Sequence, residues 1–195
     1  MIEIISNNHF EVRIWDNPSP APISCHTQRN SIRLESKKLE FDRISQCLLP
    51  NWSFDDLFKD SKGKPHLRDG THISISHSGD YAAIATATSP VGIDIQIQSP
   101  VLFKVREKFC HPIELDQLTQ STDDERYLMI WCAKEAIFKI NGHGGNFSRD
   151  IFCTHLDQTS DYLIFHQQIQ DNKSHNVGVH FFKKPNYFVA VAQNL

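Results

Sequence analysis

A carboxylate and an amide alternate with isoleucines in the middle of the chain. Asp94 and Gln96 are two positions apart, and they are interleaved with Ile93, Ile95 and Ile97. Side chains at alternate positions of a β-strand point to opposite faces, so the isoleucines should face the core while Asp94 and Gln96 project together from the other side. A carboxylate beside an amide oxygen suits Mg²⁺, which prefers oxygen ligands. An edge strand with a polar face fits the same short pattern, so further groups are needed to indicate a metal site.

A glutamate and a lysine four positions apart form a second pair. Glu135 and Lys139 should lie one above the other on a helix face, with Trp131 one turn earlier. On a solvent-facing helix such a pair contributes only a few tenths of a kcal/mol. The neighbouring positions are strongly apolar: Leu128, Ile130, Ala133, Ala136, Ile137 and Phe138. Because charged pairs in buried helices usually have a functional partner, this context favours an active-site role.

Groups suited to phosphate occur in two predicted turns. Lys64 precedes the rigid Pro65, and His77 lies between the hydroxyls of Ser76 and Ser78. Ammonium, imidazole and hydroxyl groups all donate hydrogen bonds to phosphate oxygens. Taken singly, each also fits an ordinary solvated lysine or turn histidine.

Hydrophobic patterning predicts the elements that must position these residues. Residues 73–76, 81–88 and 91–97 should form three short strands joined by tight turns, an antiparallel meander. Thr122 and Glu125 form a capping box that predicts the start of the helix carrying Glu135. The remaining predictions are strands within 1–15, 151–154, 162–169, 177–182 and 187–192, and helices over 31–49 and 101–109.

Strand and helix groups occur twice, which predicts an α+β protein in two halves, residues 1–90 and 91–195. The 39% hydrophobic content is sufficient for a buried core. The net charge of −3 provides no global basic field, so we expect neither nucleic acid nor an anionic membrane as a partner.

Five scattered cysteines without a C-x-x-C motif indicate reduced thiols. Cys110-His111 and Cys153-x-His155 lack the spacing of a zinc site. The first residues lack the basic region of a secretory signal, and no apolar run approaches the roughly 20 residues of a membrane helix. We therefore expect a cytoplasmic protein.

In order, these segments resemble the motifs of the 4′-phosphopantetheinyl transferase superfamily. The main matches are Gly63-Lys64-Pro65, Ile75-Ser76-His77-Ser78, Gly92-Ile93-Asp94-Ile95 and Trp131-x-x-Lys134-Glu135-Ala136-x-x-Lys139. Weaker similarities are Phe109-Cys110-His111-Pro112-Ile113-Glu114 and the glycine loop Gly142-His143-Gly144. Each motif is short, but their joint occurrence in this order is specific.

The resemblance implies the longer, monomeric branch of the family. Its fold would be two similar α+β halves, each an antiparallel three-stranded sheet with helices, packed as a pseudo-dimer with coenzyme A between them. Its activity would be that of a holo-[acyl-carrier-protein] synthase type enzyme, which moves phosphopantetheine from coenzyme A to a serine of an acyl or peptidyl carrier protein and releases 3′,5′-ADP.

The resemblance also implies the site residues. Asp94 and Glu135, with Gln96, would hold Mg²⁺, and Lys139 would contact the transferred phosphate. The serine proton would pass to Glu135 or to a metal-bound water, with Glu114 as a third candidate. The residues implied for the nucleotide phosphates are Lys64, Pro65, Ser76 and His77.

Two departures from the family pattern leave an alternative open. Gln96 stands where many longer members have a carboxylate, which predicts weaker metal binding. The contacts to the 3′-phosphate match no motif, and the candidates are Arg33, Lys37, Lys38 and Arg43. The second hypothesis is therefore a catalytically weak module that binds coenzyme A or a carrier protein. In either case, the choice of carrier protein would depend on the surface near residues 103–118.

Overall fold

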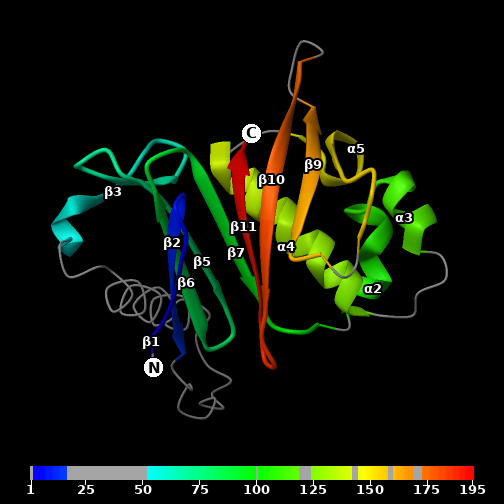
Figure 1. Cartoon of the computed structure of the whole chain (residues 1–195), viewed down its shortest axis with the longest axis horizontal. Helices are drawn as coiled ribbons and strands as arrows, with labels where there is room; N and C mark the ends of the chain where they lie inside the picture. Colours follow the sequence, from blue (N-terminus) through cyan, green and yellow to red (C-terminus); the bar gives the residue numbers. More distant parts are fainter. Residues whose placement is uncertain are drawn as a thin grey trace, which may run out of the picture.

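The computed structural model is a mixed α/β fold with two main antiparallel sheets and a small hairpin. Figure 1 shows the two sheets side by side, with the helices beyond the second sheet. The structure describes residues 2–16, 52–99, 101–118, 124–141, 145–157, 160–168 and 173–195. The helix predicted over 31–49 with its four basic residues, Thr122 of the capping box and the glycine loop 142–144 lie outside the described residues.

The first sheet has the order β1-β2-β6-β5. Its strands are β1 (Ile2–Ser6), β2 (Phe10–Asp16), β6 (Tyr81–Ala87) and β5 (His72–Ser78). The short helix η1 (Phe54–Asp56) leads into a hairpin of β3 (Leu57–Lys59) and β4 (Pro65–Leu67). Leu67 of this hairpin belongs to a small core on the first sheet, with Trp15, Ile73, Ala82 and Ile84.

The second sheet has the order β7-β11-β10-β9-β8. Its strands are β7 (Val91–Gln96), β11 (Phe188–Asn194), β10 (Ser174–Lys183), β9 (Tyr162–Gln168) and β8 (Ile151–Phe152). Aliphatic side chains from β7 and β11 pack against β2 and β6, so the two sheets share one core: Phe10, Val12, Ile14, Ala83, Ala85, Ala87, Val91, Ile93, Ile95, Val189 and Val191.

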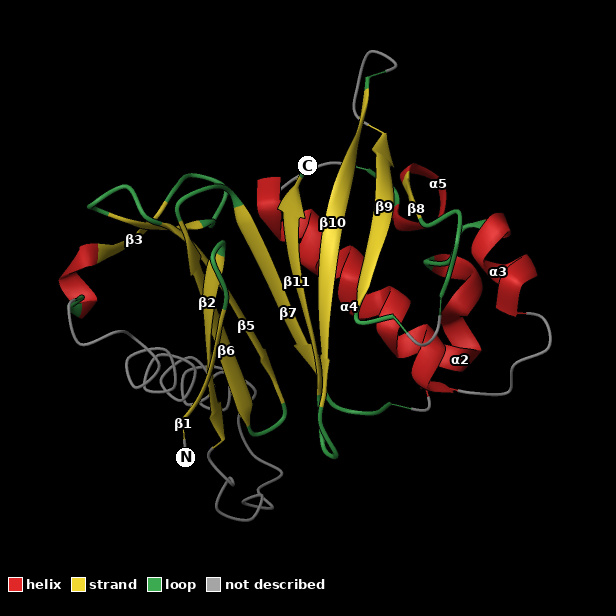
Figure 2. Ribbon diagram, viewed as in Figure 1, coloured by secondary structure: helices red, strands yellow, loops and turns green. Residues whose placement is uncertain are grey.

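The helices cover the face of the second sheet that is turned away from the first (Figure 2). They are α2 (Val101–Val105), η2 (Arg106–Lys108), α3 (Pro112–Leu118), α4 (Asp124–Asn141) and α5 (Phe147–Asp150). The longest, α4, packs across this sheet through Ile130, Ala133 and Ile137, all fully buried. Among the described helices, none combines the length and apolar character needed to cross a membrane.

The predicted meander is wrong at its third strand. β5 and β6 form the expected hairpin, but β7 pairs with β11 and belongs to the second sheet. The two main sheets consequently contain four and five described strands instead of three each. A turn sequence predicts that two strands follow one another, whereas their pairing depends on which layer buries their apolar faces.

The predicted faces of β7 are largely confirmed. Ile93 and Ile95 are fully buried between the sheets, and Asp94 lies on the opposite face. Ile97 follows the end of the strand and is 38% exposed, so its assignment to the core is wrong. The helices α3 and α5 and the hairpin β3–β4 were not predicted, because each is only a few residues long.

Candidate active site at the seam between the two sheets

Serine side chains join the two sheets where β5 lies beside β7. Backbone amides of β7 and of the residue after it donate to serine hydroxyls of β5, and the bonds repeat at every second residue. The pairs are Ile93 N to Ser74 Oγ at 3.0 Å, Ile95 N to Ser76 Oγ at 3.3 Å and Ile97 N to Ser78 Oγ at 3.2 Å. The period of two residues in a strand places all three hydroxyls on one face of β5. We call these three residues the serine ladder.

Asp94 is the centre of a compact polar cluster beside this ladder. Its side chain is buried, and its Oδ1 accepts from Ser76 Oγ at 2.7 Å and from Lys139 Nζ at 2.6 Å. Lys139 Nζ also donates to Ser76 Oγ at 2.8 Å. Residues from β5, β7 and α4 therefore meet at one carboxylate.

Backbone contacts dock α4 on β7 and thereby place Glu135 and Lys139. Gly92 lies directly against the carbonyl group of Ala136. One turn earlier, the Cys132 thiol donates to the backbone carbonyl of Asp94 at 3.2 Å. These contacts bring the predicted strand motif and the predicted helix motif together.

Glu135 is the second carboxylate of the cluster. Burial raises the pKa of Glu135, the Asp94 carboxylate raises it further, and Lys139 opposes both effects. Among the described residues, Glu135 receives no hydrogen bond. In the described part of the chain, the cluster holds two carboxylates and one ammonium, and this excess of negative charge at a partly buried site fits a divalent cation.

The predicted phosphate-binding residues lie in different places. Lys64 Nζ donates to the carbonyl of Ile140 at the end of α4, and burial lowers the pKa of Lys64. Pro65 is the first residue of β4, next to this contact. Ser76 lies in the seam, whereas the neighbouring His77 is exposed on the opposite face of β5.

The structure also contains a buried ion pair that the sequence patterns did not predict. Lys134 is fully buried, and its Nζ donates to Glu114 Oε2 at 2.5 Å and to the carbonyl oxygens of Phe109 and Phe147 at 2.8 and 2.9 Å. Glu114 in turn accepts from the amides of His111 and Cys153. The weaker motif match at Phe109–Glu114 and the lysine of the helix motif thus form one structural unit, which ties α3, α5 and the residue after β8 to α4.

This geometry excludes Glu114 as the proton acceptor. Its side chain is fully buried, and both of its oxygens are engaged by protein donors. The signal in the sequence was Lys134 itself, a charge in the middle of a strongly apolar helix, which requires a buried partner.

The described cysteines are buried thiols. Burial raises the pKa of Cys110 to about 12. Within the described ranges, no three or more His, Cys, Asp or Glu side chains gather to hold a metal ion, at Cys110-His111, at Cys153-x-His155 or elsewhere. A magnesium site in the cluster would therefore depend on the two carboxylates of Asp94 and Glu135.

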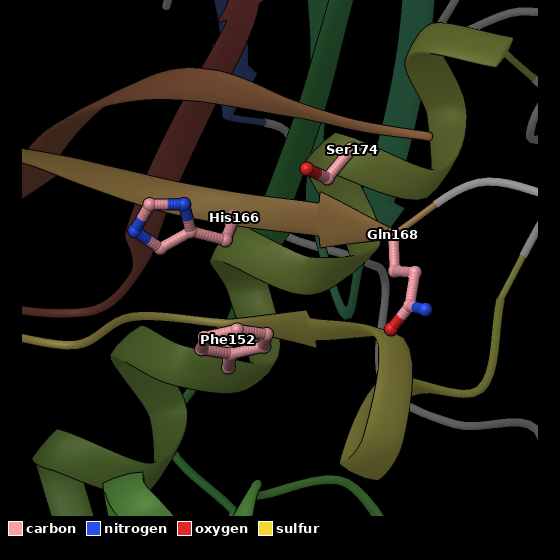
Figure 3. Close-up of a pocket in the computed structure, with 4 residues that line it drawn as sticks. All are labelled: Phe152, His166, Gln168 and Ser174. Carbon is pink, nitrogen blue, oxygen red and sulfur yellow. The ribbon is translucent and has the colours of Figure 1, made fainter. Parts of the chain in front are cut away.

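A hollow of about 220 Å³ lies elsewhere, on β8, β9 and β10, and is shown in Figure 3. Phe152, His166, Gln168 and Ser174 line it. In the strand order, β8 and β9 lie at the opposite edge of the second sheet from β7. The hollow contains none of the motif residues.

Comparison with known proteins agrees with the motifs. The sequence model of the 4′-phosphopantetheinyl transferase superfamily matches residues 90–192. 4′-phosphopantetheinyl transferase Sfp of Bacillus subtilis is 31% identical over 107 residues, which are 52% of this chain and 48% of that protein. The transferase psf-1 of Bacillus pumilus is 28% identical over 137 residues, 68% of this chain and 58% of that protein.

A third relative, the transferase gsp of Aneurinibacillus migulanus, is 32% identical over 108 residues, 54% of this chain and 46% of that protein. This chain spans about half the length of the curated relatives it matches. These relatives are of the longer type, which the resemblance implied. Because the family match covers more than half of the residues and includes the Asp94, Glu135 and Lys139 motifs, the chain belongs to the 4′-phosphopantetheinyl transferase superfamily.

Proposed function

We propose that this protein transfers 4′-phosphopantetheine from coenzyme A to a serine of an apo acyl or peptidyl carrier protein and releases 3′,5′-ADP. The observation that carries the proposal is the cluster of Ser76, Asp94 and Lys139 beside Glu135, in which motif residues from both sheets and α4 meet. The family membership and the names of the relatives support the same activity.

The cluster would hold Mg²⁺ through Asp94 and Glu135. Among the described residues, the cluster has an excess of negative charge and Glu135 receives no hydrogen bond, and both features support this assignment. When bound, Mg²⁺ would supply positive charge against the pyrophosphate oxygens of coenzyme A.

Lys139 and Glu135 have separate roles in the proposed reaction. The carrier serine oxygen forms a bond to the phosphopantetheine phosphorus, while the bond from that phosphorus to the oxygen of 3′,5′-ADP breaks and the leaving oxygen keeps the electron pair. Lys139 stabilises the charge that develops on the phosphate oxygens. The serine proton passes to the Glu135 carboxylate, the general base of the proposed reaction.

The N-terminal half would bind the nucleotide part of coenzyme A. The proposed contacts are Lys64, Pro65, Ser76 and His77. Ser76 lies in the seam and Lys64 lies beside α4, and both positions support contacts to coenzyme A near the cluster.

We further propose that residues 1–90 and 91–195 form a pseudo-dimer that works as a monomer in the cytoplasm. All described strands before residue 90 lie outside the sheet that begins with β7, which supports this division.

The test is a transfer assay with a panel of apo carrier proteins, coenzyme A and Mg²⁺, read by mass spectrometry of the carrier. We expect the phosphopantetheine mass on at least one carrier, and loss of transfer by at least about 100-fold in Asp94→Ala and in Glu135→Ala. Glu125→Ala is the matched control, because Glu125 lies on the same helix and pairs with Lys183 at its other end.

Two results would contradict the proposal. Near-native transfer in both Asp94→Ala and Glu135→Ala would show that the cluster is not the active site. Binding of coenzyme A without modification of any carrier would favour the second hypothesis, a binding module of the same fold.

A further inference from the structure

The side chain of Gln96 is held at both ends. Its Nε2 donates to Asp94 Oδ2 at 3.0 Å, and its Oε1 accepts from Ser78 Oγ at 3.3 Å. Ser78 Oγ is itself fixed as the acceptor of Ile97 N at 3.2 Å. A carboxylate only accepts hydrogen bonds, so the amide nitrogen must be the end of Gln96 that faces Asp94.

This orientation is the reverse of what a metal ligand needs. An amide binds Mg²⁺ through its oxygen, and the Gln96 oxygen is directed to Ser78, away from the Asp94 carboxylate. Turning the amide around would place its oxygen against Asp94 Oδ2 and lose the hydrogen bond to that carboxylate. Gln96 is therefore built into this site as a donor.

The two oxygens of Asp94 have partners of different kinds. Oδ2 is held by Gln96, which is anchored through Ser78 to the backbone of the strand. Oδ1 is held by Ser76 and by Lys139. The Lys139 side chain is 27% exposed, and its ammonium is carried on a long flexible stem. A cation that reaches Asp94 can displace the Lys139 ammonium more readily than the anchored amide.

We infer that Gln96 is a positioning residue for Asp94 and not a metal ligand, and that Ser78 acts through Gln96 in the same role. The pair fixes the carboxylate plane so that Oδ1 remains the oxygen that Lys139, and then the metal ion, can reach. This inference rests on the proposed function and deepens it. It also gives a reason for an amide where many longer members have a carboxylate: a second acid could not donate to Asp94 and would repel it.

The test compares Ser78→Ala with Ser74→Ala. Each change removes one hydroxyl of the serine ladder and one acceptor for a backbone amide. The Ser74 bond is buried and the Ser78 bond is exposed, so Ser74→Ala should cost at least as much stability as Ser78→Ala. Ser74 differs because, among the hydrogen bonds of the described residues, it has none to Asp94 or Gln96. Binding is measured by electron paramagnetic resonance with Mn²⁺ as the probe, and transfer is measured as kcat and KM for coenzyme A.

We expect Ser78→Ala to weaken Mn²⁺ binding by about tenfold, the lower end of the usual effect of removing a partner of a metal ligand. It should lower kcat with little change in KM, because the proposed nucleotide contacts are unaltered. Ser74→Ala should leave Mn²⁺ binding unchanged. Ser78→Thr keeps the hydroxyl and should bind Mn²⁺ as tightly as the wild type. Gln96→Met should weaken binding at least as much, and adding Ser78→Ala to it should cause no further loss, because both residues act through one hydrogen-bond path.

Other results separate this inference from the proposed function. If Gln96 were a metal ligand, Ser78→Ala would release its oxygen, and Mn²⁺ binding would stay equal or become tighter. That result, in a wild-type protein that binds Mn²⁺ and performs transfer, would overturn the inference alone. A wild-type protein that neither binds Mn²⁺ nor transfers would overturn the proposed function, and this role with it.

Discussion

Gly92 packs directly against the backbone carbonyl of Ala136, so β7 and α4 touch without an intervening side chain. A Cβ atom at position 92 would lie 1.9 Å from the Ala136 oxygen and 2.9 Å from its carbon. The obstructing atoms belong to the backbone of a buried helix, so they cannot move aside as a flexible side chain would. The separation of strand and helix at this point determines how near Glu135 and Lys139 come to Asp94.

Gly92→Ala should therefore disrupt both stability and activity. We expect a loss of about 3 kcal/mol in the free energy of unfolding, the upper range for overpacking a core, measured by urea denaturation. Transfer should fall further than the folded fraction explains, because α4 is pushed away from Asp94. Gly178→Ala is the control: its new Cβ would meet the Tyr162 side chain, away from the cluster, and should affect stability without this extra loss of activity.

Glu135→Gln should stabilise the metal-free protein at neutral pH. Burial and Asp94 raise the pKa of Glu135 above its ordinary value of 4.5, so ionised Glu135 destabilises the fold. The group favours folding fully only below the unfolded pKa, and this contribution is lost as the pH rises through the folded pKa. We expect a gain of about 0.5–2 kcal/mol at pH 7 for the neutral variant, the usual size for relieving a functional site.

The measurement is urea denaturation with a chelator, repeated along a pH series. The advantage of Glu135→Gln should disappear at pH values below the ordinary glutamate pKa, where the wild-type side chain is also neutral. Glu125→Gln, near the start of the same helix and paired with Lys183, should show no such gain. A less stable Glu135→Gln at pH 7 would contradict the electrostatic account of the cluster.

The buried pair of Lys134 and Glu114 should behave as one unit. Burial raises the pKa of Glu114 and lowers the pKa of Lys134, so removing one partner leaves an uncompensated buried group. We expect Lys134→Met to cost about 3–5 kcal/mol in unfolding free energy. The double variant with Glu114→Gln should recover at least half of that loss. Additive losses in the double variant would show that the two side chains do not act as a pair.

Lys64 should stabilise the end of α4 before any substrate binds. Its ammonium donates to the Ile140 carbonyl, one of the final carbonyls that lack a partner within the helix. Lys64→Met should lower the unfolding free energy by about 1–2 kcal/mol and speed hydrogen exchange in the last turn of α4. Lys62→Met, an exposed lysine in the same hairpin turn, is the matched control. Unchanged exchange in Lys64→Met would contradict this capping contact.

Local patterns were sufficient for most of the secondary structure. β5, β6, β9, β10, β11 and α4 lie close to their predicted positions, because apolar residues alternate or run together in each of them and turn or capping residues bound most of these segments. The pairing of β7 with β11 was not predictable in this way. Val189 and Val191 of β11 join Ile93 in the core between the sheets, and their partners are nearly one hundred residues away in the chain.

The sequence by itself determined the family, the two motif carboxylates and the lysine that meets them. The motifs are defined by residue type and order along the chain, and both can be read without the fold. Only the tertiary structure decided what each polar group contacts. It directed the Gln96 nitrogen to Asp94, turned Glu114 to Lys134, and brought Lys64 to the end of α4. A hydrogen bond depends on the distance and direction between atoms of separate segments, and a linear pattern records neither.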